Sequence, residues 1–135
     1  MNTIVDRADL LSGLEGALKA VEMPVVAYLL TRSRVDHTWW DALVDATGRL
    51  ARATWVLRYA WAWGIVVFDA SDGVQAQAIG AALVQEMRAR SVGGDVKCFL
   101  KHFRPTDTAE HVIRTMDDAV QAVEDQTLVG SSRLL

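Results

Sequence analysis

The sequence predicts an α+β domain: a plait of order β-α-β-β-α-β with one extra helix before it and another after it. Three observations favour this fold class. Large and small side chains alternate along residues 54–63, two other apolar runs stand close to prolines, and four further segments carry apolar residues at three- and four-residue spacing. A period of two is typical of strands and a period near 3.6 of helices, so the elements can be placed in order.

The N-terminal part is expected to form a helix, a strand and a second helix. Residues 8–22 carry leucines and a valine at helical spacing, and Pro24 stops this helix before the extended run at 25–32. The residue that precedes a proline disfavours helical geometry, which supports the boundary. Asp36 can cap the next helix, which runs towards Gly48.

The alternating segment decides between two folds. Together with its continuation to Asp69 it is too long for one typical strand, so we expect a hairpin that turns around Ala60 to Ala62. The alternative continues the second helix through Trp61 and leaves a three-stranded parallel α/β domain. Tryptophan, tyrosine, valine and threonine favour strands, and alternating bulk is hard to explain on a helix, so the plait is the favoured prediction.

The C-terminal part is expected to add a helix, a strand and a last helix. Residues 74–90 have helical spacing, and residues 96–103 alternate until Pro105 stops the strand. Asp107 and Glu110, three residues apart, fit a capping box for the last helix. We therefore expect one domain over residues 1–135, divided into an N-terminal helix (1–22), the plait (23–104), a C-terminal helix (105–126) and a frayed tail (127–135).

Composition narrows the expected partners and location. Of the 135 residues, 51% are hydrophobic and 23% are charged, as in a globular domain. The formal net charge of −3 argues against nucleic acid or an acidic membrane surface as a partner, since both require a basic surface. No uncharged run approaches the length of a membrane-spanning helix. Cys98 is the single cysteine, which excludes an internal disulfide, and we expect a cytoplasmic protein without a cofactor.

Three stretches carry a resemblance to a known group of proteins. They read Met23-Pro24 followed by V-V-A-Y-L-L-T-R, then W-V-L-R-Y-A-W-A-W-G-I-V-V-F-D-A-S-D, and finally D-V-K-C-F-L-K-H-F. In this pattern the chain resembles ferredoxin-like proteins of the dimeric α+β barrel superfamily, and in particular the GYD-domain proteins. The resemblance implies a sheet whose free face is covered by a second subunit, and hence a dimer. It carries over no functional residue, because the hairpin reads A-W-A-W where the family has Gly-x-Tyr-Asp.

The candidate site is the face of the sheet that carries the bulky residues. We assign as interface or ligand-binding residues Trp55, Leu57, Tyr59, Trp61, Trp63 and His102. Three interpretations stay open: ordinary core beneath two helices, a subunit interface, or a pocket for a flat apolar ligand. His102 could enter such a pocket as an acid, a base or a haem ligand. No histidine pair has metal-binding spacing, so no metal site is expected, and no catalytic residue is identified.

The last predicted strand alternates lysine with phenylalanine. Lys97, Phe99, Lys101 and Phe103 would share one side of it. Basic and aromatic residues interleaved on a sheet are typical of RNA-binding surfaces, whereas lysines along an edge strand prevent unwanted pairing. The acidic balance of the chain favours the edge strand.

Two functions compete on these observations. The favoured hypothesis is an oligomeric interaction or assembly protein that uses the aromatic sheet face as its interface, with a homodimer or a higher homo-oligomer as the expected state. Surplus tryptophans and two extra amphipathic helices need covering surface, whereas no convergent set of polar residues requires chemistry. The alternative is a small-molecule-binding protein or a cofactor-independent enzyme of the barrel type, with a flat apolar small molecule in an aromatic-lined pocket.

Overall fold

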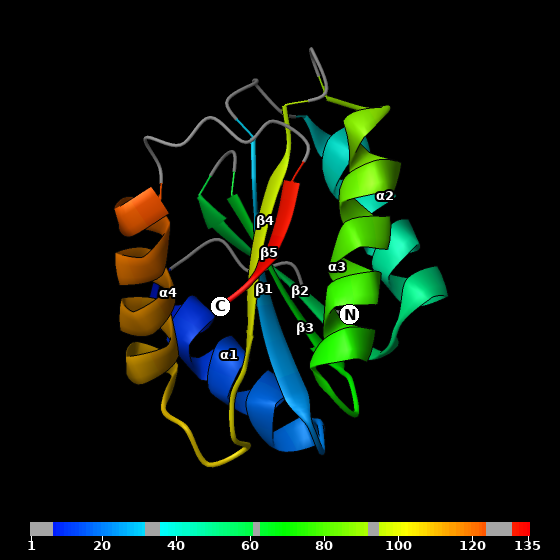
Figure 1. Cartoon of the computed structure of the whole chain (residues 1–135). Helices are drawn as coiled ribbons and strands as arrows, with labels where there is room; N and C mark the ends of the chain where they lie inside the picture. The colour runs from blue at the N-terminus through cyan, green and yellow to red at the C-terminus, as the bar shows by residue number, and fades with distance from the viewer. Residues whose placement is uncertain (1–6, 32–35, 61–62, 92–94, 124–130) are drawn as a thin grey trace.

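The predicted plait is confirmed in a computed structural model that describes residues 7–31, 36–60, 63–91, 95–123 and 131–135. Strands β1 to β4 form an antiparallel sheet, with one helix before the plait and one after it (Figure 1). The elements, in chain order, are α1 (Arg7–Ala20), β1 (Pro24–Leu30), α2 (His37–Leu50), β2 (Arg52–Ala60), β3 (Trp63–Asp69), α3 (Gly73–Arg88), β4 (Lys97–His102), α4 (Ala109–Val123) and β5 (Ser131–Leu134).

The alternating segment is extended, and the helical alternative is wrong. β2 ends at Ala60 and β3 begins at Trp63, so the two strands meet where the length of the extended segment predicts a hairpin. The two strands pair antiparallel, with Leu57 opposite Ile65. Within the described residues the sheet has the order β2-β3-β1-β4-β5, so the three-stranded parallel domain is also excluded.

The C-terminal strand corrects the expected frayed tail. Residues 131–134 form β5, which runs parallel to β4 with Ser132 opposite Cys98. The Leu135 N–H donates to the carbonyl oxygen of Leu100 at 2.8 Å, and the Gln77 side chain donates to the carbonyl oxygen of Ser132 at 3.1 Å. The expectation for 127–135 is therefore wrong for 131–134, while residues 127–130 lie outside the described residues. Lys97 and its strand are likewise not at an edge, because β4 lies between β1 and β5.

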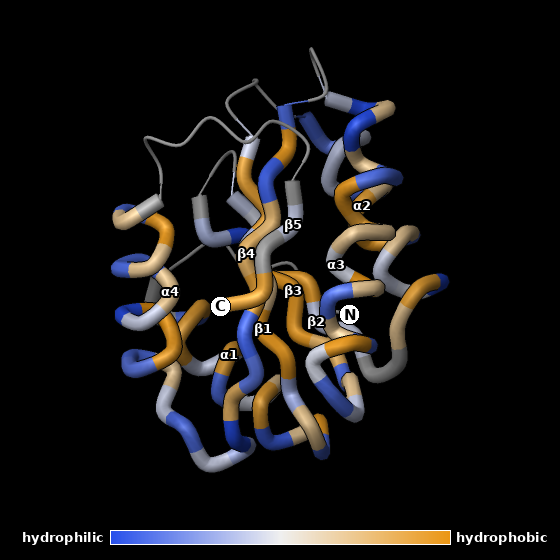
Figure 2. Tube along the Cα trace, in the orientation of Figure 1, coloured by the Kyte–Doolittle hydropathy of each residue, from blue (hydrophilic) through white to orange (hydrophobic). Residues whose placement is uncertain are grey.

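The sheet is covered on both faces. α2 and α3 lie against one face, and α1 and α4 lie against the other (Figure 1). All seven residues of β1 are buried, and hydrophobic residues gather in the central strands (Figure 2). The face that the barrel resemblance leaves to a second subunit is thus occupied by helices of the same chain. Among the described residues, no helix has the length and apolar character needed to cross a bilayer.

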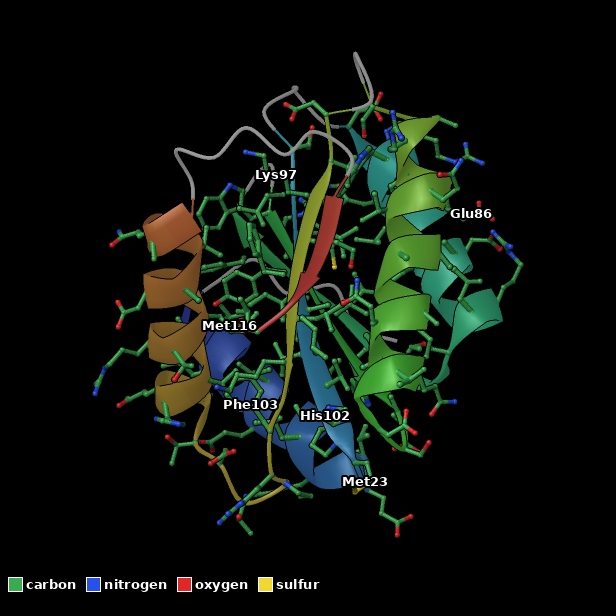
Figure 3. The ribbon with its side chains drawn as sticks, in the orientation of Figure 1. Met23, Glu86, Lys97, His102, Phe103 and Met116 are labelled. Atoms are coloured by element: carbon green, nitrogen blue, oxygen red, sulfur yellow. The ribbon has the colours of Figure 1, made fainter. Side chains whose placement is uncertain are left out.

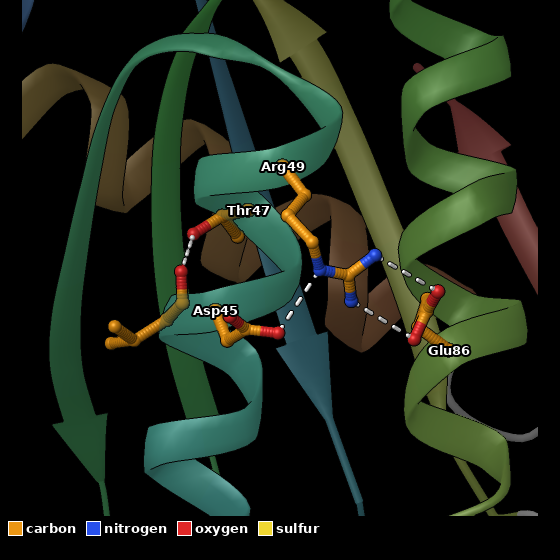
Figure 4. Close-up of polar contacts among 5 residues, drawn as sticks. Asp45, Thr47, Arg49 and Glu86 are labelled. Carbon is orange, nitrogen blue, oxygen red and sulfur yellow. Dashed lines mark hydrogen bonds and ion pairs between the residues drawn. The ribbon is translucent and has the colours of Figure 1, made fainter.

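Polar contacts connect α2 with α3 and satisfy a buried hydroxyl group of α2. Arg49 of α2 lies 3.3 Å from the Glu86 carboxylate of α3 and 3.0 Å from Asp45 (Figure 4). These two carboxylates raise the pKa of the Arg49 guanidinium, Glu86 more than Asp45. Since the pair is exposed, salt screens it and its share in stability is small. Thr47 is buried, and its hydroxyl donates to the carbonyl oxygen of Val44 at 3.0 Å.

The predicted N-terminal cap of α2 is confirmed, whereas that of α4 is wrong. Asp36 caps α2 as expected, with Oδ1 accepting from the N–H groups of Thr38 and Trp39 at 3.0 and 3.2 Å. At α4 the expected capping box of Asp107 and Glu110 is wrong by one position. The Thr108 hydroxyl accepts from the N–H of His111 at 3.2 Å, whereas the carboxylate of Asp107 accepts from the N–H of Arg104.

Cys98 is predicted to be unreactive in the folded protein. Its side chain is 1% exposed, and burial raises the pKa of the thiol to about 12. Because the thiolate is the reactive form, the neutral thiol at mildly alkaline pH should not react with Ellman's reagent in the native state. In guanidinium chloride it should react completely. Stoichiometric reaction of the native protein would contradict the burial of this side chain.

Candidate functional site

The structure gathers most of the predicted aromatic face. Trp55, Leu57 and Tyr59 of β2 and Trp63 of β3 all pack into the core beneath α1 and α4. Leu57 is fully buried, whereas the three aromatic side chains are partly exposed. Trp61 lies outside the described residues. These residues are therefore core on one side and partly open on the other.

His102 is not part of this group. It pairs with Val25, at the end of the sheet opposite to Lys97 (Figure 3). By alternation along β4, its side chain shares the face of Cys98 and Leu100, which pack towards α2 and α3. Its Nε2 lies 3.0 Å from the carbonyl oxygen of Ala70, so this nitrogen donates a hydrogen bond to the backbone.

An aspartate of α4 ties two tyrosines together. The hydroxyl of Tyr28 donates to Asp117 Oδ1 at 3.2 Å, and that of Tyr59 donates to Asp117 Oδ2 at 2.8 Å. The two tyrosine rings meet edge to face at 5.6 Å between centroids, and Trp63 lies 5.9 Å from Tyr59. The result is an aromatic cluster joined to α4 by one carboxylate. Neither Tyr28 nor Asp117 is predicted as a site residue from the sequence, although Asp117 stands four residues after a core position, Ile113.

A small pocket opens next to this cluster, at the end of the sheet. The register places Leu30 opposite both Trp63 and Lys97, which brings strands β1, β3 and β4 together there. The pocket has a volume of about 60 Å³ and is lined by Leu30, Thr31, Trp63, Asp95, Lys97, Phe99 and Val120. Ligand pockets usually measure several hundred Å³, so this one admits a chemical group rather than a whole ring system. This pocket is too small to enclose a flat ligand.

The pocket combines several kinds of polar group with an indole. Lys97 is 8% exposed and Thr31 is 4% exposed, which is unusual burial for a lysine. Asp95 supplies a carboxylate and Trp63 an aromatic ring at the same opening. Such a set can offer a cation to an anionic group, an acceptor to N–H donors and a surface for stacking. Among the residues that the structure describes, no three histidine, cysteine, aspartate or glutamate side chains group closely enough to hold a metal ion.

Comparison with known proteins establishes the fold. No protein-family model and no curated protein matches the sequence. The structure is similar to the GGDEF domain of TpbB (YfiN) from Pseudomonas aeruginosa, with 21% identity, a TM-score of 0.66, and 97% of this chain and 90% of that chain covered. It is similar to the coiled coil and GGDEF domain of DgcB from Caulobacter crescentus, solved with c-di-GMP, with 14% identity, a TM-score of 0.70, and 98% and 82% covered. It also matches the diguanylate cyclase SiaD of P. aeruginosa in complex with its activator SiaC, with 14% identity, a TM-score of 0.69, and 98% and 59% covered.

These matches correct two expectations. The resemblance to GYD-domain proteins of the dimeric α+β barrel superfamily is wrong, because the similar structures are GGDEF domains. The hypothesis of an assembly protein with an aromatic sheet interface is wrong for the same reason, and α1 and α4 cover that face. Both errors arise from the strand pattern, which many plaits share. The letters GGDEF, read as amino acids, do not occur in the sequence: Gly93-Gly94-Asp95 is followed by Val96.

Proposed function

We propose that this protein is a small-molecule-binding domain with the fold of GGDEF domains, and that its ligand is a guanine nucleotide such as c-di-GMP. The observation that carries the proposal is the pocket at the sheet end, where Trp63, Lys97 and Asp95 meet. One of the similar structures, DgcB, was solved with c-di-GMP. A homodimer, expected from the sequence, is a separate proposal; the matched cyclase SiaD was solved in complex with a different protein, its activator SiaC, and so does not bear on it.

The chemistry of the pocket suits a nucleotide that lies across its opening. The partly exposed ring of Trp63 offers a surface on which a purine can stack. The ammonium group of Lys97 attracts a phosphate, and the carboxylate of Asp95 can accept from the N–H groups on the edge of guanine. With about 60 Å³, the pocket takes one phosphate oxygen or one exocyclic group, and the rest of the nucleotide remains outside.

Replacing Lys97 by methionine is expected to weaken the binding of c-di-GMP. A hydrogen bond to a charged group is worth roughly 1.5–3 kcal/mol, which corresponds to a loss of affinity of about ten- to a hundredfold. Isothermal titration calorimetry with c-di-GMP, GTP and GDP would measure the affinity of each variant. Lys101→Met is the matched control: Lys101 is on the same face of β4 and pairs with Val26, away from the pocket. We expect its affinity to stay within about twofold of the unsubstituted protein.

Two results would contradict the proposal. One is the absence of binding for all three nucleotides at millimolar concentration. The other is an equal loss of affinity in both lysine variants, which would place the nucleotide elsewhere. Circular dichroism would show that both variants fold. Incubation with GTP and a divalent cation, followed by chromatography of the products, would separate binding from synthesis of c-di-GMP.

A further inference from the structure

Arg58 presents a cation that lacks an acceptor in the described structure. It lies on β2 opposite Gly64, and its guanidinium carbon is 4.7 Å from the centroid of the Trp40 ring. Its Nε is buried and has no hydrogen-bond partner among the described residues. The ion pairs formed by the described residues belong to another arginine, Arg49. A buried donor without an acceptor is unfavourable, and it commonly marks a place where a ligand, an ion or water binds.

The ring beneath Arg58 is held in place by its surroundings. Trp40 is 5% exposed and belongs to α2, whose residues pack against the same sheet face. Gly64 makes the close approach possible: a Cβ at this position would lie 3.0 Å from Trp40 Cζ3 and 3.1 Å from Leu43 Cδ2. The absence of a side chain on β3 at Gly64 therefore leaves room for the indole, over which the guanidinium carbon of Arg58 lies. A partner can reach Arg58 only from the side away from this ring.

This geometry selects the chemistry of the partner. A planar guanidinium donates in its own plane in two parallel bonds, either through Nε–H and a neighbouring Nη–H or through its two Nη groups. Because Nε of Arg58 is buried, a ligand that approaches from outside meets the two Nη groups. Phosphate and carboxylate oxygens match this fork, and an uncharged acceptor gains less from it. We propose that Arg58, supported by Trp40, binds a phosphate group of a small-molecule ligand. The choice of phosphate over carboxylate rests on the proposed function, whereas the existence of an oxyanion site does not.

The site is distinct from the pocket of Lys97. Tyr59, the next residue, points to α4, so by alternation Arg58 points to the face that α2 covers. Leu29 of β1 pairs with Gly64 and Leu30 with Trp63, so both sites lie at the same end of the sheet, on opposite faces. Arg58 is thus a second position at this end where an anionic group can be held.

The inference is tested by titrating inorganic phosphate into the ¹⁵N-labelled protein at constant ionic strength, while the arginine Nε–H resonances are followed. The Arg58 resonance is assigned by its disappearance in Arg58→Lys. We expect it to move and to saturate, whereas the resonance of the exposed Arg49 should not move. Phosphate should raise the melting temperature of the unsubstituted protein, and this shift should be lost in Arg58→Gln. Arg58→Lys keeps the charge but not the fork, and it should bind phosphate about tenfold more weakly.

Three outcomes would overturn the inference. The Arg58 resonance could stay in place at saturating phosphate, all arginine resonances could move together, or acetate could act at the same concentration as phosphate. If Arg58→Gln does not fold by circular dichroism, Arg58→Lys and the resonance shift still decide. Phosphate binding at Arg58 without nucleotide binding would support this site and reject the proposed function. Nucleotide binding that depends on Lys97, together with an Arg58 resonance that does not move, would support the proposed function and reject the site at Arg58.

Discussion

Gly80→Ala is expected to lower the free energy of unfolding by about 2 kcal/mol, although alanine is the better helix former. Gly80 lies in α3, where this helix crosses β4 and β5. A Cβ there would overlap the Leu100 side chain and would lie 2.7 Å from the hydroxyl oxygen of Ser132. Leu100 is completely buried, so the Leu100 side chain, α3 or β5 must shift within the packed core to make room. Each of these shifts loses packing.

Gly16→Ala is the matched control for this substitution. Gly16 also lies inside a helix, α1, but nothing stands within 4 Å of the position of its Cβ. Here only helix propensity changes, so we expect a gain of up to about 1 kcal/mol. Urea denaturation of both variants, followed by tryptophan fluorescence, measures the two effects. If Gly80→Ala proves as stable as the unsubstituted protein, α3 does not approach the sheet as closely as described.

Asp117→Ala is expected to destabilise the protein by about 2 kcal/mol, because two tyrosine hydroxyls lose a charged acceptor. Tyr28 is completely buried and Tyr59 is partly buried, and both donate to this carboxylate from different strands. The expected loss of stability is smaller than two fully buried hydrogen bonds to a carboxylate would give, because part of the aromatic cluster contacts solvent. α4 would also lose these two polar contacts with the sheet.

A double-mutant cycle separates this contact from a general effect on the helix. Tyr59→Phe should cost about 1 kcal/mol in the unsubstituted protein and nearly nothing in the presence of Asp117→Ala. Asp118→Ala, at the exposed neighbouring position, should stay within about 0.5 kcal/mol of the unsubstituted protein. Thermal or urea denaturation provides the values. Equal losses for Asp117→Ala and Asp118→Ala would show that the tyrosine contacts do not stabilise the fold.

The fold could be predicted from the sequence where local pattern and tertiary position agree. Alternating bulk at Trp55, Leu57 and Tyr59 revealed β2 because one side of that strand is buried beneath α1 and is rich in large residues. β5 could not be predicted, since Ser131–Leu134 is short and has no apolar period. Its place depends on contacts with β4 and α3 that come from distant parts of the chain. The α4 cap was misplaced because Asp107 and Thr108 are both good capping residues.

The candidate site was only partly predictable, for a related reason. Lys97, Asp95 and Trp63 meet because of the register between strands, and register cannot be read from one strand alone. The surplus of apolar surface was recognised, but it was assigned to a missing subunit. In the structure, the apolar stripes of α1 and α4 and the aromatic sheet face cover one another. Two apolar surfaces predicted from one sequence can therefore cover each other within the same chain, without a second subunit.

All seven residues of the central strand β1 are buried, and helices lie on either side of it. The proposed binding pocket accordingly lies at the end of the sheet, where Leu30, Trp63 and Lys97 of three strands meet. Trp63 and Phe99 belong both to the hydrophobic core and to the lining of the pocket. A substitution at either position is therefore expected to change stability together with the pocket, whereas Asp95 can vary with less effect on the packed layers.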